Sequence, residues 1–231
     1  MSCPMCRTRS HPRLTCRSFF GLAPLARDQL CPSCRAAFVF YESGNCPGCG
    51  KSGVAEDACP ECAYWHMVYP EKTFAHRGLI HYEGAMKEVL QQYKYGGDYR
   101  LRQVFSEIIA AALGPLSKKG WQIVPIPSVA AKNQQRGFDP VSALLEAAGI
   151  PQTPLLEKMT ATAPQAGKSR QERLRLVQPF QLHATLREQP ICLFDDVYTT
   201  GRTLFHAKYL FWRSGPFWQG TENLISISLA R

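Results

Sequence analysis

The segment from Ile191 to Thr203, ICLFDDVYTTGRT, constrains the fold more than any other part of this 231-residue chain. Its first four residues form an apolar run of the length of a buried strand, and Asp195 and Asp196 end that run. A turn rich in threonine and glycine follows, and a helical pattern begins after it. A strand that leads through such a turn into a helix predicts an α/β fold with a ligand site at the carboxyl end of the strand.

The turn has the chemistry of a phosphate site. Backbone N–H groups at the start of a helix, together with the positive end of its dipole, attract phosphate oxygens. Gly201 lets the backbone approach a ligand closely, and the two carboxylates can accept hydrogen bonds from ribose hydroxyls. The candidate binding residues are therefore Asp195, Asp196, Thr199, Thr200, Gly201, Arg202 and Thr203. The simpler alternative is that the acids end a strand and the threonines cap a helix.

This pattern resembles the motif that type I phosphoribosyltransferases use to bind phosphoribosyl pyrophosphate (PRPP). The shared features are the apolar run, the Asp-Asp pair and the Thr-Thr-Gly-x-Thr turn. The resemblance implies a parallel sheet flanked by helices, in the manner of a type I phosphoribosyltransferase. It also implies that the chain binds PRPP with Mg²⁺, and that Asp195 and Asp196 are the catalytic residues of any such activity.

Nine of the ten cysteines lie in the first 62 residues, and eight of them form Cys-x-x-Cys pairs. Two such pairs can complete a tetrahedral site for zinc, so eight ligands predict two structural zinc ions. Pairing in chain order gives one site from Cys3, Cys6, Cys31 and Cys34, and a second from Cys46, Cys49, Cys59 and Cys62. A cross-braced pairing is the alternative. Cys16 remains as a packed or surface thiol, and His66 is a weaker candidate ligand.

These patterns divide the chain into two parts. We expect a cysteine-rich double zinc-ribbon module over residues 1–70 and a phosphoribosyltransferase-like domain over residues 71–231. Zinc in the first part either folds a segment too small for its own core or builds a platform for nucleic acid or a partner protein. Aromatic residues at the join pack between the two parts or stack on bases.

Other segments complete the predicted pocket. Residues 121–126 are a second candidate buried strand, whose end would form the other wall. Arg136 is the candidate for gripping a phosphate or pyrophosphate, because its fork matches those oxygens. Lys94 lies in a glycine-containing turn after a helix that begins at Gly84, and it either reaches the pyrophosphate or simply ends the helix. A second helix is expected over Tyr99–Leu113, with Gly114-Pro115 as its stop signal.

Residues 151–180 have the composition of a long loop, and their basic side chains suggest two uses. The loop either closes over a charged ligand or follows a nucleic-acid backbone. The charges that matter most are Lys158, Lys168, Arg170, Arg173 and Arg175.

Composition indicates which partners and which cellular compartment are expected. The net charge is +9, and residues 73–231 carry 19 Lys and Arg against 12 Asp and Glu, which favours phosphate-rich partners. No apolar run is long enough to span a membrane, and residues 1–10 lack the apolar core of a secretory signal. Ten cysteines without such a signal favour a reducing compartment, so we expect a cytoplasmic protein without membrane insertion.

Taken together, the chain is similar to the ComF-type family of competence proteins, whose relatives include the GntX-type proteins. The likeness rests on the cysteine pairs, the residues 94–98, the Val124–Pro127 segment with Arg136-Gly137-Phe138, Gln165, Glu172-Arg173, and the acid-threonine motif. It departs from the family pattern at Asp139, where Asn is usual, and at Leu174–Leu176. The resemblance implies a role in DNA uptake and natural transformation, with single-stranded DNA and a helicase-like DNA-processing protein as partners.

Two functions follow from these features. One is a competence protein that binds PRPP and single-stranded DNA. The alternative is an active PRPP-dependent phosphoribosyltransferase with an unknown acceptor, in which positioning and electrostatics would assist the departure of pyrophosphate. A regulator that senses PRPP is a weaker possibility, because no helix of a DNA-reading type is evident.

Overall fold

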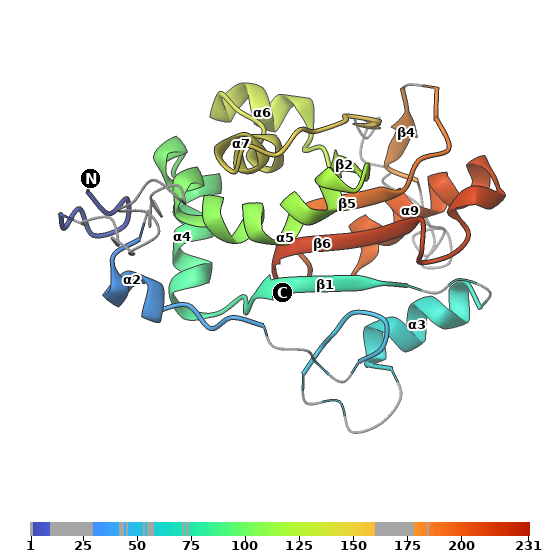
Figure 1. The fold of residues 1–231 in the computed structure, drawn as a ribbon, viewed down its shortest axis with the longest axis horizontal. Helices are drawn as coiled ribbons and strands as arrows, with labels where there is room; N and C mark the ends of the chain where they lie inside the picture. The colour runs from blue at the N-terminus through green and yellow to red at the C-terminus, as the bar shows by residue number, and fades with distance from the viewer. Residues whose placement is uncertain are drawn as a thin grey trace, which may run out of the picture.

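The computed structural model describes residues 2–9, 30–41, 44, 46–52, 54, 58–70, 72, 74–159, 178–183 and 185–231. A four-stranded parallel sheet forms the centre, with the strand order β1-β6-β5-β2 (Figure 1). The strands are β1 (His76–Ile80), β2 (Gln122–Pro125), β5 (Ile191–Val197) and β6 (Leu224–Ala230). The predicted α/β class with a parallel sheet flanked by helices is confirmed.

Both faces of the sheet are buried. Since side chains on a strand alternate between its two faces, neighbouring residues of one strand contribute to different cores. Cys192 and Phe194 of β5 contribute to one apolar core, and Ile191 and Leu193 contribute to the other. A strand with a core on each side is a continuous apolar run, which is the pattern that the sequence shows here.

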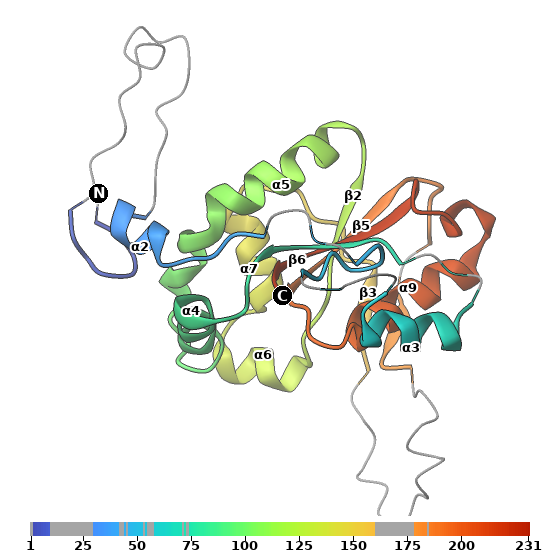
Figure 2. The ribbon, with the colours of Figure 1, turned by 90° about the horizontal axis from the view of Figure 1, so that it is seen from below.

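Helices cover the two faces. On one face lie α4 (Gly84–Lys94), the 3-10 helix η1 (Tyr99–Phe105), α5 (Ser106–Lys118) and α7 (Pro140–Ala147). On the other lie α3 (Pro60–Val68), α9 (Arg202–Ser214) and the 3-10 helix η2 (Pro216–Trp218). Figure 2 shows α5 on one side of the sheet and α3 with α9 on the other.

The helix expected to stop at Gly114-Pro115 runs on to Lys118, so that expectation is wrong. Pro115 takes away the N–H that would bond to the carbonyl of Ala111. Ala111 and Pro115 are both exposed, so water can satisfy the freed carbonyl. Leu113 on the buried side keeps the helix against the core.

Two further expectations need correction. β5 does not end at Phe194 but continues through Asp195 and Asp196 to Val197, and Asp195 stands in register with Ser228 of β6. The stretch 151–180 is not one continuous loop, because β3 (Leu156–Lys158) and β4 (Phe180–Leu182) pair antiparallel. Two sets of residues that the sequence singled out lie outside the described ones. The first is residues 160–177, with Lys168, Arg170, Arg173 and Arg175, and the second is the stretch that contains Cys16.

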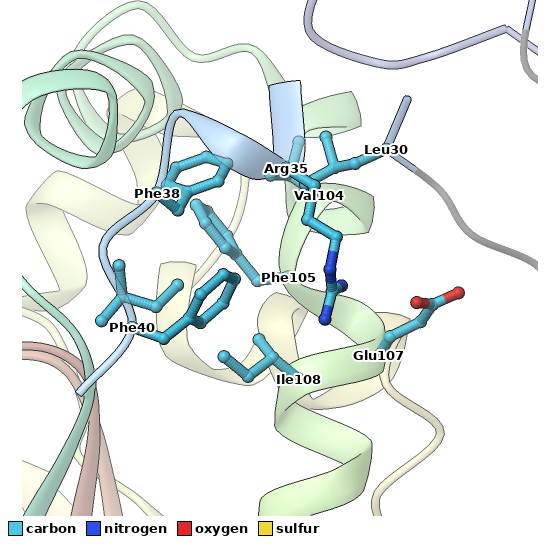
Figure 3. Close-up of a pocket in the computed structure, with 9 residues that line it drawn as sticks. Leu30, Arg35, Phe38, Phe40, Val104, Phe105, Glu107 and Ile108 are labelled. Carbon is cyan, nitrogen blue, oxygen red and sulfur yellow. The ribbon is translucent and has the colours of Figure 1, made fainter. Parts of the chain in front are cut away.

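The N-terminal segments pack directly against the sheet domain. After the short helix α2 (Pro32–Ala36), the buried Phe38 meets Phe105 edge to face, with ring centroids 5.7 Å apart. Phe40 forms a β-bridge with Ile80 of β1. Figure 3 shows Phe38, Phe40 and Leu30 facing Val104, Phe105 and Ile108 around a small apolar pocket. This packing supplies the cysteine-rich segments with a core that they lack by themselves.

Within the described part of the chain, none of the helices is both long enough and apolar enough to cross a bilayer.

Candidate functional site

A cleft opens at the carboxyl ends of β2 and β5, which are neighbours in the sheet. The chain leaves β2 for α6 (Ala130–Arg136) and α7, and α7 packs on one face of the sheet. It leaves β5 for α9 on the opposite face. Two adjacent strands whose outgoing connections diverge in this way leave a crevice between them, which is where open α/β sheets bind ligands.

The cleft has a volume of about 260 Å³ and is open to solvent at its mouth. Its walls bring together residues that lie up to about a hundred positions apart in the chain. Those that bear on the chemistry are Lys94, Ile126, Pro127, Ser128, Lys132, Arg136, Lys158, Asp195, Asp196 and Thr203. Four cations face two carboxyl groups, so the cleft suits an anionic ligand.

The two acids differ in their surroundings. Asp196 forms an ion pair with Lys94, with 2.7 Å between Oδ2 and Nζ. Asp195 accepts a hydrogen bond from the backbone N–H of Asp196 at 2.9 Å, but burial, and then the charge of Asp196, raise its pKa to about 8. Burial therefore favours the protonated form of Asp195, while Asp196 has Lys94 as its ion-pair partner.

Arg136 is placed at the end of α6 by two contacts. Its Nε donates to the carbonyl of Lys94 at 2.6 Å, and its guanidinium lies 5.8 Å from the centre of the Phe138 ring. Its Nη1 is buried and has no hydrogen-bond partner among the described residues. A buried guanidinium nitrogen without a partner is costly. An anion in the cleft would supply the missing acceptor.

Asp139, the departure from the family pattern, organises this wall of the cleft. Its Oδ1 accepts from the N–H of Ser142 at 3.0 Å and so caps the start of α7. Its Oδ2 accepts from the N–H of Ser128 at 3.1 Å and from the side-chain amide of Asn133 at 2.8 Å. One carboxylate thus ties the end of β2 to both α6 and α7.

The turn Thr199–Thr203, called the phosphate loop below, leads from β5 into α9. Gly201 has a φ of +77°, and a Cβ at this position would lie 2.5 Å from the hydroxyl of the buried Tyr198. Only glycine meets both conditions. Among the described residues, none accepts a hydrogen bond from the backbone N–H groups of this loop. Thr203 lines the cleft, and Thr199, Thr200 and Arg202 are exposed beside it.

The sequence indicated some of these residues and missed others. The glycine-containing turn marked Lys94 as a candidate for the site, although the sequence did not indicate its pairing with Asp196. No pattern marked Lys132, because α6 was not predicted. His76, which had no recognisable partner, lies between the hydroxyls of Ser226 and Ser228 at 3.1 Å each. These partners come from a strand 150 residues away.

The eight paired cysteines form two clusters, and in each the four sulfur atoms lie within 4.8 Å of one another. The pairing follows chain order. The first cluster is Cys3, Cys6, Cys31 and Cys34, and the second is Cys46, Cys49, Cys59 and Cys62. Four cysteine sulfurs at such spacing can hold a structural zinc ion.

The two clusters repeat one local design. The N–H of Arg7 donates to the carbonyl of Cys3, and the N–H of Gly50 donates to that of Cys46, each at 2.8 Å. Arg7 and Gly50 both have positive φ, 61° and 69°. The remaining pair of each cluster begins a short helix, α2 or α3, with proline in its first turn. Thiolates at a helix start are favoured by the helix dipole.

Two zinc ions per chain are expected by native mass spectrometry. Cys34→Ser should remove only the first ion and Cys62→Ser only the second, because each residue belongs to one cluster. A Cys34→Ser chain without either ion would contradict two independent sites.

Gly201→Ala should destabilise the chain by about 2 kcal/mol or more, because alanine at positive φ is strained by about 1–2 kcal/mol and its Cβ also meets Tyr198. Gly149→Ala is the matched control. Gly149 also has a positive φ, +66°, but apart from its chain neighbours a new Cβ there has no atom within 4 Å, so only the backbone strain of about 1–2 kcal/mol is expected. Urea unfolding measures both. Equal effects of the two substitutions would refute the assigned loop geometry.

Comparison with known proteins places the chain in a family. No protein-family model matches it. Over 218 residues it is 34% identical to the competence protein ComFC of Streptococcus pneumoniae, covering 93% of this chain and 95% of that protein. Over 209 residues it is 28% identical to the competence protein ComFC of Bacillus subtilis, covering 89% and 86%. With this identity over almost the whole of both chains, the protein belongs to the ComFC family of competence proteins.

Proposed function

We propose that this chain acts in DNA uptake during natural transformation, by binding PRPP with Mg²⁺ in the cleft and single-stranded DNA at the surface around it. Its relatives carry the name of competence proteins, which supports the cellular role. The observation that carries the ligand is the cleft itself. Asp195, Asp196, Arg136 and Thr203 line it, and within the described part of the chain the N–H groups of the phosphate loop and the Nη1 of Arg136 have no hydrogen-bond partner.

Each part of PRPP has a matching group in the cleft. The 5-phosphate fits the phosphate loop, where N–H groups and threonine hydroxyls are donors. The ribose hydroxyls fit Asp195 and Asp196. The pyrophosphate fits the wall formed by Ile126, Pro127 and Arg136, where the Nη1 of Arg136 needs an acceptor. Mg²⁺ binds oxygen ligands and would neutralise part of the charge of the pyrophosphate.

An active phosphoribosyltransferase is the alternative use of the same cleft. Asp196 forms an ion pair with Lys94, and a carboxylate at that point would stabilise positive charge that develops on the ribose. The acceptor is not identified by any side chain of the cleft, and binding without turnover therefore stays our main proposal.

Single-stranded DNA fits the cationic surroundings of the cleft. Lys132 and Lys158 lie on its walls, and the basic stretch that continues from Lys158 lies outside the described residues. Phosphates of a single strand would be attracted to this side of the molecule. A cytoplasmic site of action beside a helicase-like protein follows from this proposal.

For PRPP, the double variant Asp195→Asn with Asp196→Asn should abolish binding in calorimetry with MgCl₂, because each substitution replaces one acceptor oxygen by an NH₂ group that cannot accept from a ribose hydroxyl and removes the carboxylate charge. Glu146→Gln is the control, since Glu146 pairs with Arg102 outside the cleft. Undiminished binding by the double variant would eliminate the pocket as assigned.

For DNA, the affinity for an oligothymidine should fall steeply as the salt concentration rises. Replacing Lys132 and Lys158 by Gln should reduce the slope of log affinity against log salt by about 0.7 for each phosphate that is no longer neutralised. Lys118→Gln with Lys119→Gln, at the far end of α5, is the charge-matched control. If both pairs of substitutions change the slope equally, the cleft surface is not the binding face.

A further inference from the structure

The second cysteine cluster reaches the phosphate loop through a tryptophan. Trp65 belongs to α3, the helix that begins at the cluster with Cys59 and Cys62. It is buried, and its indole N–H donates to the carbonyl of Thr200 at 2.8 Å. Its ring stacks on Phe205 in the first turns of α9, with centroids 4.4 Å apart. Figure 2 shows α3 beside α9.

This hydrogen bond sets the direction of a peptide group in the loop. In a trans peptide the C=O and the following N–H point in opposite directions. Because Trp65 holds the carbonyl of Thr200, the N–H of Gly201 must point away from α3. That N–H belongs to the set for which the described residues provide no acceptor. The indole therefore orients one of the donors that a phosphate would use.

Contacts of Arg231 also join the same cluster to Tyr198, next to the phosphate loop. Arg231 donates from Nη2 to Cys49 Sγ at 2.7 Å and from Nε to the carbonyl of Cys49 at 3.2 Å. Its guanidinium carbon lies 4.6 Å from the centre of the Tyr198 ring. The hydroxyl of Tyr198 lies 2.5 Å from the position that a Cβ on Gly201 would take. The loop is therefore supported from the cluster at two points, Thr200 and Gly201.

We propose that the second cysteine cluster is a working part of the phosphate site, and that Trp65 is a positioning residue which couples the cluster to the affinity for a phosphorylated sugar. This inference rests on the proposed binding of PRPP. Metal in the cluster holds the start of α3, which fixes Trp65 and so keeps the Gly201 N–H turned outward. The first cluster has no such contact with the loop among the described residues.

The test removes the indole N–H while keeping an aromatic ring. Trp65→Phe retains stacking on Phe205 and removes the bond to Thr200. Trp218→Phe is a matched control, because Trp218 is equally buried and its indole donates to the carbonyl of Gln189 at 3.1 Å, away from the loop. Calorimetry with PRPP and MgCl₂ should show about 3- to 10-fold weaker binding for Trp65→Phe and unchanged binding for Trp218→Phe.

Two further measurements separate positioning from general damage. Both variants should keep two zinc ions per chain, since neither tryptophan is a ligand. In ¹⁵N-labelled wild-type protein, the indole N–H signal missing from Trp65→Phe should shift on saturation with PRPP and MgCl₂, while the signal missing from Trp218→Phe should stay. That shift shows that the ligand reaches the loop which Trp65 contacts, and the loss of affinity in Trp65→Phe then measures the contribution of its hydrogen bond.

The outcomes are distinct. Weaker binding and a shifted Trp65 signal support the coupling. Equal affinity of the wild type and Trp65→Phe overturns it and leaves the proposed function standing. A wild-type chain that does not bind PRPP overturns the proposed function, and the coupling with it.

Discussion

The placement of β5 between β2 and β6 is the constraint on which the rest of the structure depends. Its backbone is paired on both edges and its side chains are buried on both faces, so the strand has no freedom to shift register. A shift by one residue would move Phe194 and Leu193 into the opposite cores. Because the register is held in this way, Asp195 and Asp196 are delivered to the end of the sheet beside the end of β2.

Burial of two carboxylates is unfavourable, and the structure offsets this cost differently for each acid. Asp196 forms an ion pair with the partly exposed Lys94. Burial, and then the charge of Asp196, raise the pKa of Asp195 to about 8, which favours its protonated form.

The cysteine-rich segments pack against the elements that form the cleft and the phosphate loop. Phe38 and Phe40 extend the core on the side of η1 and β1, and Trp65 and Arg231 connect the second cluster to the loop before α9. The elements that supply metal ligands are thereby the same elements that pack on the sheet. The cysteine-rich segments, which are too small to form their own core, gain stability from packing on the sheet, and the phosphate loop gains fixed contacts.

The sequence by itself determined the elements whose signal is local. The apolar run of β5, the threonine-glycine turn, the helix pattern of α4 and the cysteine pairs each need only neighbouring residues. All four appear, although β5 continues past its apolar run to Val197. Helix α6 was missed because it buries none of its residues and so shows no apolar periodicity. The β3-β4 pair and the passage of α5 through Pro115 were missed because packing, and not local propensity, decides them. Only the tertiary structure decided that Lys94 pairs with Asp196, that the buried Nη1 of Arg136 has no partner among the described residues, and that Trp65 donates to Thr200. Each of these contacts joins residues far apart in the chain, and their meeting depends on the order of the strands and the faces their connections cover, which no local pattern encodes.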